Sequence, residues 1–220
     1  MNEPKGMNTN LHVLEAYTCL FQASKNPLVG NALEKLIDVF NEKIIDKNGH
    51  VVIFFSENWT PKTSEISYGH DIETSWLLWE AAVLVNNPEQ LKKIKQRVLH
   101  MVDAFLVEGY DEQSHSVFYE LHTKNNVLDA DRHWWVQVEA MEGLANAFKI
   151  TQNKAYLDIV FSIWKYVSTY MIDRENGEWF WRVSEHNVPY VTDQKAGMWK
   201  CPYHNSRALM RIIDKINSLV

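Results

Sequence analysis

Hydrophobic positions recur at helical spacing in seven stretches of the chain, and these stretches are of two alternating kinds. Four begin with polar or aromatic residues and then become apolar. The other three lack the polar start, and each leads into an acidic turn and a short aromatic segment with strand character. The pattern predicts a repeating unit of helix, turn, helix and hairpin-like loop. The polar-start helices begin within 8–17, 69–75, 132–140 and 203–209, the plain helices cover 28–45, 88–106 and 154–171, and the strand-like segments are 46–56, 111–121 and 173–183.

The segment 67–82, SYGHDIETSWLLWEAA, shows the polar start most clearly. Asp71 is a candidate N-cap, because its carboxylate can accept hydrogen bonds from the free N–H groups of a first helical turn. His70 would then lie at the start of the helix, where the macrodipole favours the neutral imidazole. The apolar positions that predict the buried face of this helix are Ile72, Trp76, Trp79 and Val83.

The unit recurs about every sixty residues, as the spacing of Asp46, Asp111 and Asp173 in the three acidic turns indicates. Units that cannot bury both faces alone stack side by side, as a solenoid or a closed toroid. In a toroid the polar-start helices would form the inner ring, with their N-terminal ends at one rim. Because no linker or low-complexity segment divides the chain, residues 1–220 are predicted to form a single all-α domain.

Composition narrows the range of partners. The formal net charge of −6 argues against nucleic acid. The chain has neither an apolar leader nor eighteen consecutive apolar residues, so we expect no membrane binding. It has two cysteines, Cys19 and Cys201, which lack metal-ligand spacing, and this favours a reducing compartment. We therefore expect a cytoplasmic protein. Nine Trp, nine Tyr and nine Phe could simply fill a core. They also suit a sugar-binding cleft, where indole faces stack on pyranose rings.

Three histidines, His12, His70 and His204, occupy equivalent positions in the polar starts. Each is followed three residues later by a Glu or Arg that would share its helix face and could orient the ring. A single histidine near a helix start is usually a capping or core residue, but three in register, near several tryptophans, favour a shared site. The histidines out of register, which we interpret as loop, surface or supporting residues, are His50, His100, His115, His122, His133 and His186.

Two other chemistries compete for these residues. Three histidines can bind zinc, but their spacing lacks the i, i+4 or Cys-x-x-Cys pattern of typical sites, and acid–base work by imidazoles needs no metal. Paired carboxylates can hydrolyse glycosides. However, Glu15, Glu73 and Glu139 lie one turn inside their predicted helices, which suits orienting a histidine better than flanking a glycosidic bond. We find no P-loop, dinucleotide fingerprint or nucleophile elbow, so no cofactor is expected.

Several long segments occur in the order typical of one family. SYGHDIETSWLLWEAA, HWWVQVEAMEGLANAF, GEWFWRV and KAGMWKCPYHNSRA, together with MNTNLHVLEAYT, resemble the cellobiose 2-epimerase branch of the N-acylglucosamine 2-epimerase family. The resemblance runs from about Met7 to the C-terminus. It implies an (α/α)₆ toroid and reversible epimerisation at C2 of the reducing-end sugar of a β-1,4-linked disaccharide such as cellobiose, without cofactor or metal.

The resemblance also implies roles for particular residues. His70 and His204 match the acid–base histidines of the GHD and PYHN motifs, and His12 matches a third at NTxLH. Histidine suits this chemistry, because C2 must lose a proton beside an aldehyde and regain it with opposite configuration near neutral pH. The residues that match positions lining the sugar pocket are Asn8, Glu73, Trp134, Trp135 and Trp199.

Family members are about twice as long, which predicts a partial toroid here: about seven helices, where a closed (α/α)₆ toroid has twelve. An open arc would expose apolar inner faces at its edge and leave the site incompletely walled. We therefore expect an inactive fragment, a chain that pairs with a separately encoded N-terminal half, or self-association of two copies. The competing functional class is a non-catalytic carbohydrate-binding module of the same fold.

Overall fold

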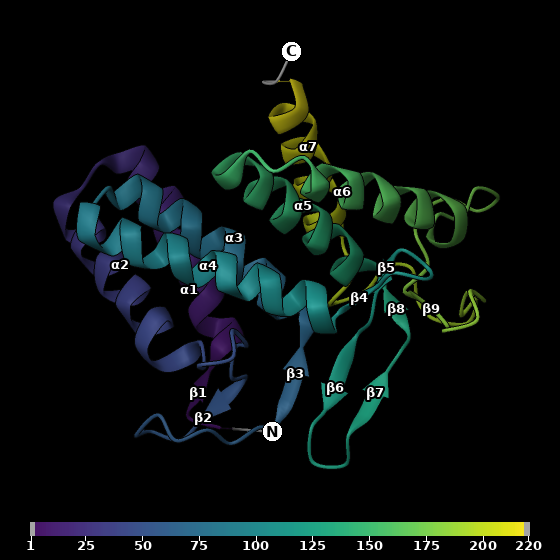
Figure 1. Cartoon of the computed structure of the whole chain (residues 1–220), viewed down its shortest axis with the longest axis horizontal. Helices are drawn as coiled ribbons and strands as arrows, with labels where there is room; N and C mark the ends of the chain where they lie inside the picture. The colour runs from purple at the N-terminus through teal and green to yellow at the C-terminus, as the bar shows by residue number, and fades with distance from the viewer. Residues whose placement is uncertain (1–2, 218–220) are drawn as a thin grey trace.

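The computed structural model describes residues 3–217, and within this range the chain is mostly helical, with two π-helical turns and several short strands (Figure 1). The predicted all-α class, with about seven helices and hairpin-like loops, is confirmed. The helices of the described range are α1 (Met7–Ser24), α2 (Pro27–Val39), α3 (Tyr68–Val85), α4 (Pro88–Glu108), α5 (Trp134–Thr151), α6 (Ala155–Tyr166) and α7 (Tyr203–Asn217).

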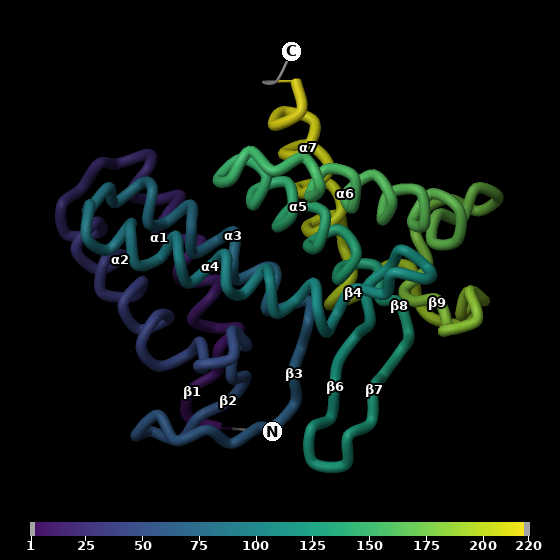
Figure 2. The backbone as a smooth tube through the Cα atoms, viewed as in Figure 1, coloured from purple at the N-terminus to yellow at the C-terminus, as the bar shows by residue number. Residues whose placement is uncertain are grey.

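The helices form two layers. In the inner layer, α1 packs on α3, α3 on α5 and α5 on α7. In the outer layer, α2, α4 and α6 pack against α1, α3 and α5, the helices that directly precede them in the chain. The alternation of polar-start inner helices with plain outer helices is the one that the hydrophobic pattern predicts. Figure 2 shows the two ends of the described chain far apart, at opposite ends of the view.

A short strand directly precedes each of the inner helices α1, α3 and α5. β1 (Lys5–Gly6) leads directly into α1, β3 (Glu65–Ser67) into α3 and β8 (Arg132–His133) into α5. The sheet of β3, β6 and β7 projects away from the helices (Figure 1). The antiparallel pairs are β1 with β2 (Phe54–Phe55), β3 with β6 (Glu120–His122), β6 with β7 (Val127–Asp129), β4 (Tyr110–Asp111) with β5 (Ser116–Val117), and β8 with β9 (Arg182–Val183).

The outer helices lead into the same kind of acidic turn. The carboxylates of Asp46, Asp111 and Asp173 each accept a hydrogen bond from the backbone N–H two residues later, at 2.9, 3.0 and 3.0 Å. Before this turn, α2 and α6 widen into π-helical turns over Phe40–Ile44 and Val167–Met171. The recurrence of one turn after each outer helix supports the sixty-residue repeat seen in the sequence.

The inner helices α3 and α5 are buried on most sides. Helix α3 contributes to two apolar cores, one within α1–α4 and one within α3–α7, and α5 contributes its buried residues to the second. Their close approach depends on Gly143 of α5. A Cβ at this position would lie 2.5 Å from Cγ1 of Ile72 and 3.1 Å from its backbone oxygen. Only a glycine therefore lets the two backbones come this close.

The start of α3 differs from the prediction. The helix begins at Tyr68 with Ser67 in the N-cap position, and Asp71 lies inside it, fully buried. The N-cap prediction for Asp71 is wrong, because its carboxylate binds the neighbouring loop instead of the first turn. The predicted core face is half right, because one side of α3 faces the open side of the inner layer. Ile72 and Trp76 are buried, whereas Trp79 is half-buried and Val83 is 48% exposed.

None of the helices in residues 3–217 combines the length and apolar character needed to cross a membrane. Cys19 and Cys201 are free thiols on the surface.

Candidate active site

A cavity of about 500 Å³ lies where the N-terminal ends of the four inner helices meet. The helix starts therefore gather at one rim, as the repeat predicts. All of the site residues predicted from the sequence line this cavity. Its lining consists of Asn8, His12, His70, Glu73, Tyr119, His133, Trp134, Trp135, Trp181, Met198, Trp199, Cys201, Tyr203 and His204.

His70 lies in the first turn of α3. Its Nδ1 is 2.8 Å from the hydroxyl of Ser67, the N-cap residue, and its ring centroid is 4.9 Å from that of Trp135. Burial, aided by the nearby His204 and His12, lowers the pKa of His70 to about 4. The imidazole is therefore neutral at physiological pH, as its place at a helix start predicts, although burial is the main cause.

His204 lies in the first turn of α7 and is oriented by a carboxylate from another helix. Its Nδ1 is 2.6 Å from Oε1 of Glu139 in α5. Its ring centroid lies 5.5 Å from that of Trp135, so the same indole contacts both His70 and His204. A buried carboxylate on Nδ1 fixes the tautomer, so that the lone pair of the neutral ring is on Nε2.

Arg207, one turn further along α7, joins carboxylates from three inner helices. Its Nη1 is 2.7 Å from Glu15, and its Nη2 lies 2.6 Å from Glu139 and 3.2 Å from Glu73. Burial alone would raise the pKa of Glu139, but hydrogen bonds from His204 and the charge of Arg207 lower it. Burial and the neighbouring Glu139 raise the pKa of Glu73 well above its usual value. The pair therefore differs in charge: Glu139 is the ionised member.

His12, the third predicted histidine, lies on α1 at the opposite side of the same network. Its Nδ1 is 3.2 Å from Oε2 of Glu15 and 3.4 Å from the hydroxyl of Tyr203. Burial would raise the pKa of Glu15, but hydrogen bonds from His12 and Tyr203 and the charge of Arg207 lower it to about 2. An ionised Glu15 thus holds His12 in place across the physiological range.

The expected pairing of each histidine with the residue three positions later holds only for His12 and Glu15. It is wrong for His70, which bonds Ser67, and for His204, which bonds Glu139. The physical reason is that the inner helices converge here, so a partner from a neighbouring helix lies closer than one on the same helix.

The predicted tryptophans differ in exposure. Trp134 and Trp135 are buried at 3% and 9% exposure, whereas Trp199, on the loop before α7, is 74% exposed. Trp134 packs against Trp181 with ring centroids 4.6 Å apart. Asn8 lies exposed at the start of α1. The cavity thus has a rigid aromatic wall on α5 and an open aromatic edge on the loop.

His133 lines the cavity although it is out of register and the sequence interpretation placed it outside the site. Its ring stacks on that of Tyr119, with centroids 3.7 Å apart. Burial lowers the pKa of His133 to about 4. The available signal was its position directly before Trp134, at the end of β8. Other lining residues that sequence reasoning missed are Tyr119, Trp181, Met198, Cys201 and Tyr203.

Ligand atoms of Glu73, Glu139 and His204 lie within 4.8 Å of one another, close enough to contact a single metal ion. Nη2 of Arg207 already contacts both carboxylates. Its positive charge repels a cation at this position. The arrangement therefore favours orienting His204 over coordinating an ion.

Comparison with known proteins points to one family. The family model described as N-acylglucosamine 2-epimerase (GlcNAc 2-epimerase) matches residues 1–208. The chain is 37% identical to a cellobiose 2-epimerase of Dictyoglomus turgidum and 38% identical to one of Bacteroides fragilis, over 96% and 97% of its length. The solved cellobiose 2-epimerase of Bacillus thermoamylovorans superposes with a TM-score of 0.90 at 40% identity, covering 96% of this chain and 53% of that one.

The chain spans about half the length of the curated relatives it matches, 54% of each of the two named above. Its helices correspond to half of an (α/α)₆ epimerase structure, which confirms the partial toroid predicted from the resemblance to longer family members. The chain therefore belongs to the N-acylglucosamine 2-epimerase family, a family of isomerases.

Proposed function

We propose that this chain carries the acid–base part of a sugar 2-epimerase site. The reaction is reversible inversion of C2 in the reducing-end sugar of a β-1,4-linked disaccharide, such as cellobiose. The observation that carries this proposal is the packing of two imidazoles, His70 and His204, against the indole of Trp135 in one cavity. Two proton-transfer groups within reach of one carbon are what inversion requires.

The reaction begins with opening of the sugar ring to the aldehyde. The C2–H bond then breaks, its proton passes to an imidazole, and its electron pair forms the C1=C2 bond of an enediolate with negative charge on O1. An imidazolium then returns a proton to the other face of C2 and restores the aldehyde with inverted configuration. The donor is the imidazole that took the proton, after rotation about the C2–C3 bond, or the second imidazole in its protonated form. The sequence leaves open which histidine acts first.

The surroundings of the two rings favour His204 as the abstracting base. Its Nδ1–H donates to ionised Glu139, which stabilises the imidazolium that forms when Nε2 takes the proton. His70 is neutral and bonds Ser67 through Nδ1, so its Nε2 is the nitrogen that would face C2 or O1 from the other side. His12, held by Glu15, is the third donor we assign to the developing negative charge.

The remaining lining residues suit a disaccharide. Trp134, Trp135 and Trp199 offer indole faces for two sugar rings, and Asn8 and Glu73 offer polar groups for hydroxyls. The relatives named cellobiose 2-epimerase support this substrate class for the complete site. Positioning by such contacts can lower the barrier by several kcal/mol.

The experiment that tests the reaction is incubation of cellobiose in D₂O with the chain completed by the N-terminal half of a relative, followed by NMR of C2. We expect deuterium at C2 together with the glucosyl-mannose epimer, and a loss of exchange by about a hundredfold or more in His70→Asn and His204→Asn. His100→Asn, an exposed histidine of α4, is the matched control and should exchange normally. Sugar binding without exchange would favour a carbohydrate-binding module, and release of monosaccharides a hydrolase.

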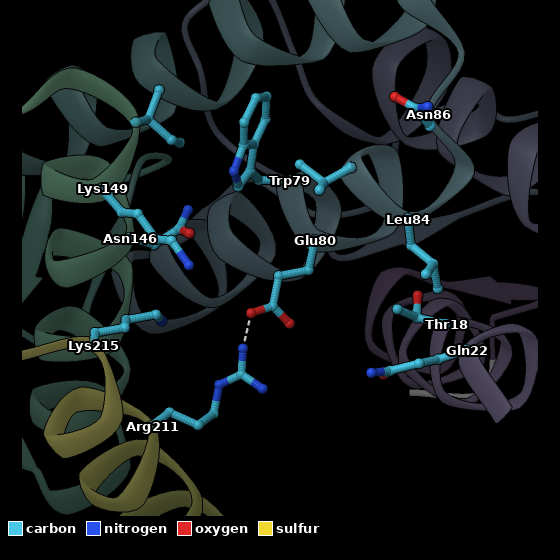
Figure 3. A pocket seen from close by; sticks show the side chains of 12 residues that line it. Thr18, Gln22, Trp79, Glu80, Leu84, Asn86, Asn146, Lys149, Arg211 and Lys215 are labelled. Atoms are coloured by element: carbon cyan, nitrogen blue, oxygen red, sulfur yellow. Dashed lines mark ion pairs between the residues drawn. The ribbon is translucent and has the colours of Figure 1, made fainter. Parts of the chain in front are cut away.

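We further infer that full turnover requires closure of the open side of the arc. A second cavity of about 780 Å³ lies between α1, α3, α5 and α7, at the far end of these helices from the histidines (Figure 3). The helices at the two ends of the inner layer, α1 and α7, also expose apolar side chains to solvent. These are Val13, Tyr17 and Leu20 on α1, and Met210 and Ile213 on α7.

The occupant we propose for this side is a helical N-terminal half of the toroid, since the matched relatives are nearly twice as long as this chain. Mixing the chain with the N-terminal half of a relative should raise epimerisation well above the trace expected of the chain alone. Turnover by a homodimer, found by light scattering at the active concentration, would favour two copies instead. Robust turnover by a monodisperse monomer would refute the need for closure.

A further inference from the structure

A buried charged pair adjoins His70 and takes no part in the site described above. Nδ1 of His50, in the loop after α2, lies 2.8 Å from Oδ2 of Asp71 in α3. The second carboxylate oxygen of Asp71 accepts a hydrogen bond of 2.7 Å from the backbone N–H of Val51. His50 is 4% exposed and Asp71 is fully buried. Burial raises the pKa of the Asp71 carboxyl, against the hydrogen bonds from His50 and Val51 that lower it. Burying an ionisable pair is costly unless both members are well paired.

The pair ties three elements together at the start of α3. The backbone N–H of His50 donates to Oδ1 of Asp46 at 2.9 Å, which fixes the acidic turn. Nε2 of His50 lies 3.4 Å from Oε2 of Glu108, the last residue of α4. Asp71 directly follows His70 in the chain. The orientation of the first turn of α3 therefore depends on contacts with both the preceding loop and α4.

The next unit of the repeat binds its strand-like segment through a neutral amide at the same helix position. Gln137 is the fourth residue of α5, as Asp71 is of α3. Its Oε1 accepts from the backbone N–H of Val117 at 2.8 Å, and its Nε2 donates to the carbonyl of the same residue at 2.8 Å. A neutral amide thus binds the equivalent strand-like segment in that unit. In that unit the buried charge comes from Arg132, before α5, whose Nη2 lies 2.6 Å from Oδ2 of Asp111. In the unit of His70 it comes from Asp71, within the helix and next to His70.

We propose that His50 and Asp71 are positioning residues for His70. They fix the first turn of α3 against the loop and α4, which sets the His70 ring between Ser67 and Trp135. This inference deepens the proposed function and rests on it for its catalytic meaning. The positional claim itself concerns only the folded chain and can be tested without turnover.

The charges that face His50 give it a pKa far from that of His70, so the two histidines titrate in different pH ranges. Burial would lower the pKa of His50, but Asp71, Glu108 and Asp46 raise it to about 9. Burial, together with the nearby Glu108 and Asp71, raises the pKa of the Tyr68 hydroxyl to about 12. His70 titrates at about pH 4, so a change in its surroundings near pH 9 reports the pair and not its own protonation.

The experiment is NMR of the histidine ring protons between pH 7 and 10 in the full chain, with folding checked by circular dichroism. In the wild type, the His70 signals should shift in step with titration of His50 near pH 9. His50→Asn keeps a donor for Asp71 but cannot be charged, so its His70 signals should not shift with pH in this range. Asp71→Asn should displace the His70 signals already at pH 7. His186→Asn, at an exposed position after β9, is the control and should behave as wild type.

The proposal would be overturned if both folded variants gave the same His70 signals as the wild type at pH 7 and the wild-type His70 signals did not shift near pH 9. Should Asp71→Asn fail to fold, the His50→Asn titration decides alone. In the active assembly, we expect His50→Asn to lower kcat by about tenfold or more with little change in KM, because a displaced proton-transfer group slows chemistry more than binding. Absence of epimerisation in the wild type as well would refute the proposed function and leave the positional result intact.

Discussion

Replacing Glu139 by Gln tests the charge network at its centre. The two oxygens of this buried carboxylate face three donors. Oε1 lies 2.6 Å from Nδ1 of His204 and 2.6 Å from Nη2 of Arg207, while Oε2 accepts from the indole N–H of Trp76 at 3.0 Å. Glutamine has the same shape but only one acceptor oxygen. Whichever way its amide is turned, its NH₂ group faces a donor.

The expected loss of stability follows from these contacts. A buried donor left without an acceptor costs about 1–3 kcal/mol. Removing one partner of a buried ion pair costs about 3–5 kcal/mol. Because Arg207 keeps Glu15 and Glu73 as partners, the second figure is an upper limit here. We therefore expect Glu139→Gln to lower the free energy of unfolding by about 2–4 kcal/mol, within the usual total of about 5–15 kcal/mol, so the variant still folds.

Urea unfolding followed by tryptophan fluorescence measures this loss. Glu112→Gln, at an exposed position after α4, serves as the control and should change stability by less than about 0.5 kcal/mol. The indole N–H signal of Trp76 should also move in the Glu139 variant and stay unchanged in the control. A loss below about 1 kcal/mol with an unmoved Trp76 signal would refute the idea that this carboxylate unites the network.

Further predictions concern packing and pH. Gly143→Ala should lower the free energy of unfolding by about 1–3 kcal/mol, measured in urea, because its Cβ would meet Ile72 and force α3 and α5 apart. Gly69→Ala should cost a similar amount and quench or shift Trp135 emission, since its Cβ would lie 2.4 Å from that indole. The free energy of unfolding should fall as the pH drops from about 6.5 to about 4, because the folded state disfavours protonation of His70 and the unfolded state does not. Thermal melts of the wild type and His70→Asn across this range measure the effect. An equal pH dependence in the two proteins would contradict this prediction.

The hydrophobic pattern determined the architecture because helix periodicity and burial are local properties of a sequence. Outer helices α2 and α4 are amphipathic, and the turns at Asp46, Asp111 and Asp173 recur with the repeat, so both could be placed from residue order alone. The register of His12, His70 and His204 within that repeat also predicted their meeting at one rim, since equivalent positions of stacked units lie side by side.

Only the tertiary structure decided which groups act on one another. His204 takes its carboxylate from α5, Asp71 binds a loop instead of capping α3, and His133 reaches the cavity by stacking on Tyr119. These partners are 65, 20 and 14 residues apart in the chain, and no local pattern relates them. The protonation of His70 likewise follows from its burial, which depends on how neighbouring helices pack around it. Periodicity fixes which face of a helix is buried, whereas contacts between faces depend on the angles and distances at which whole helices meet.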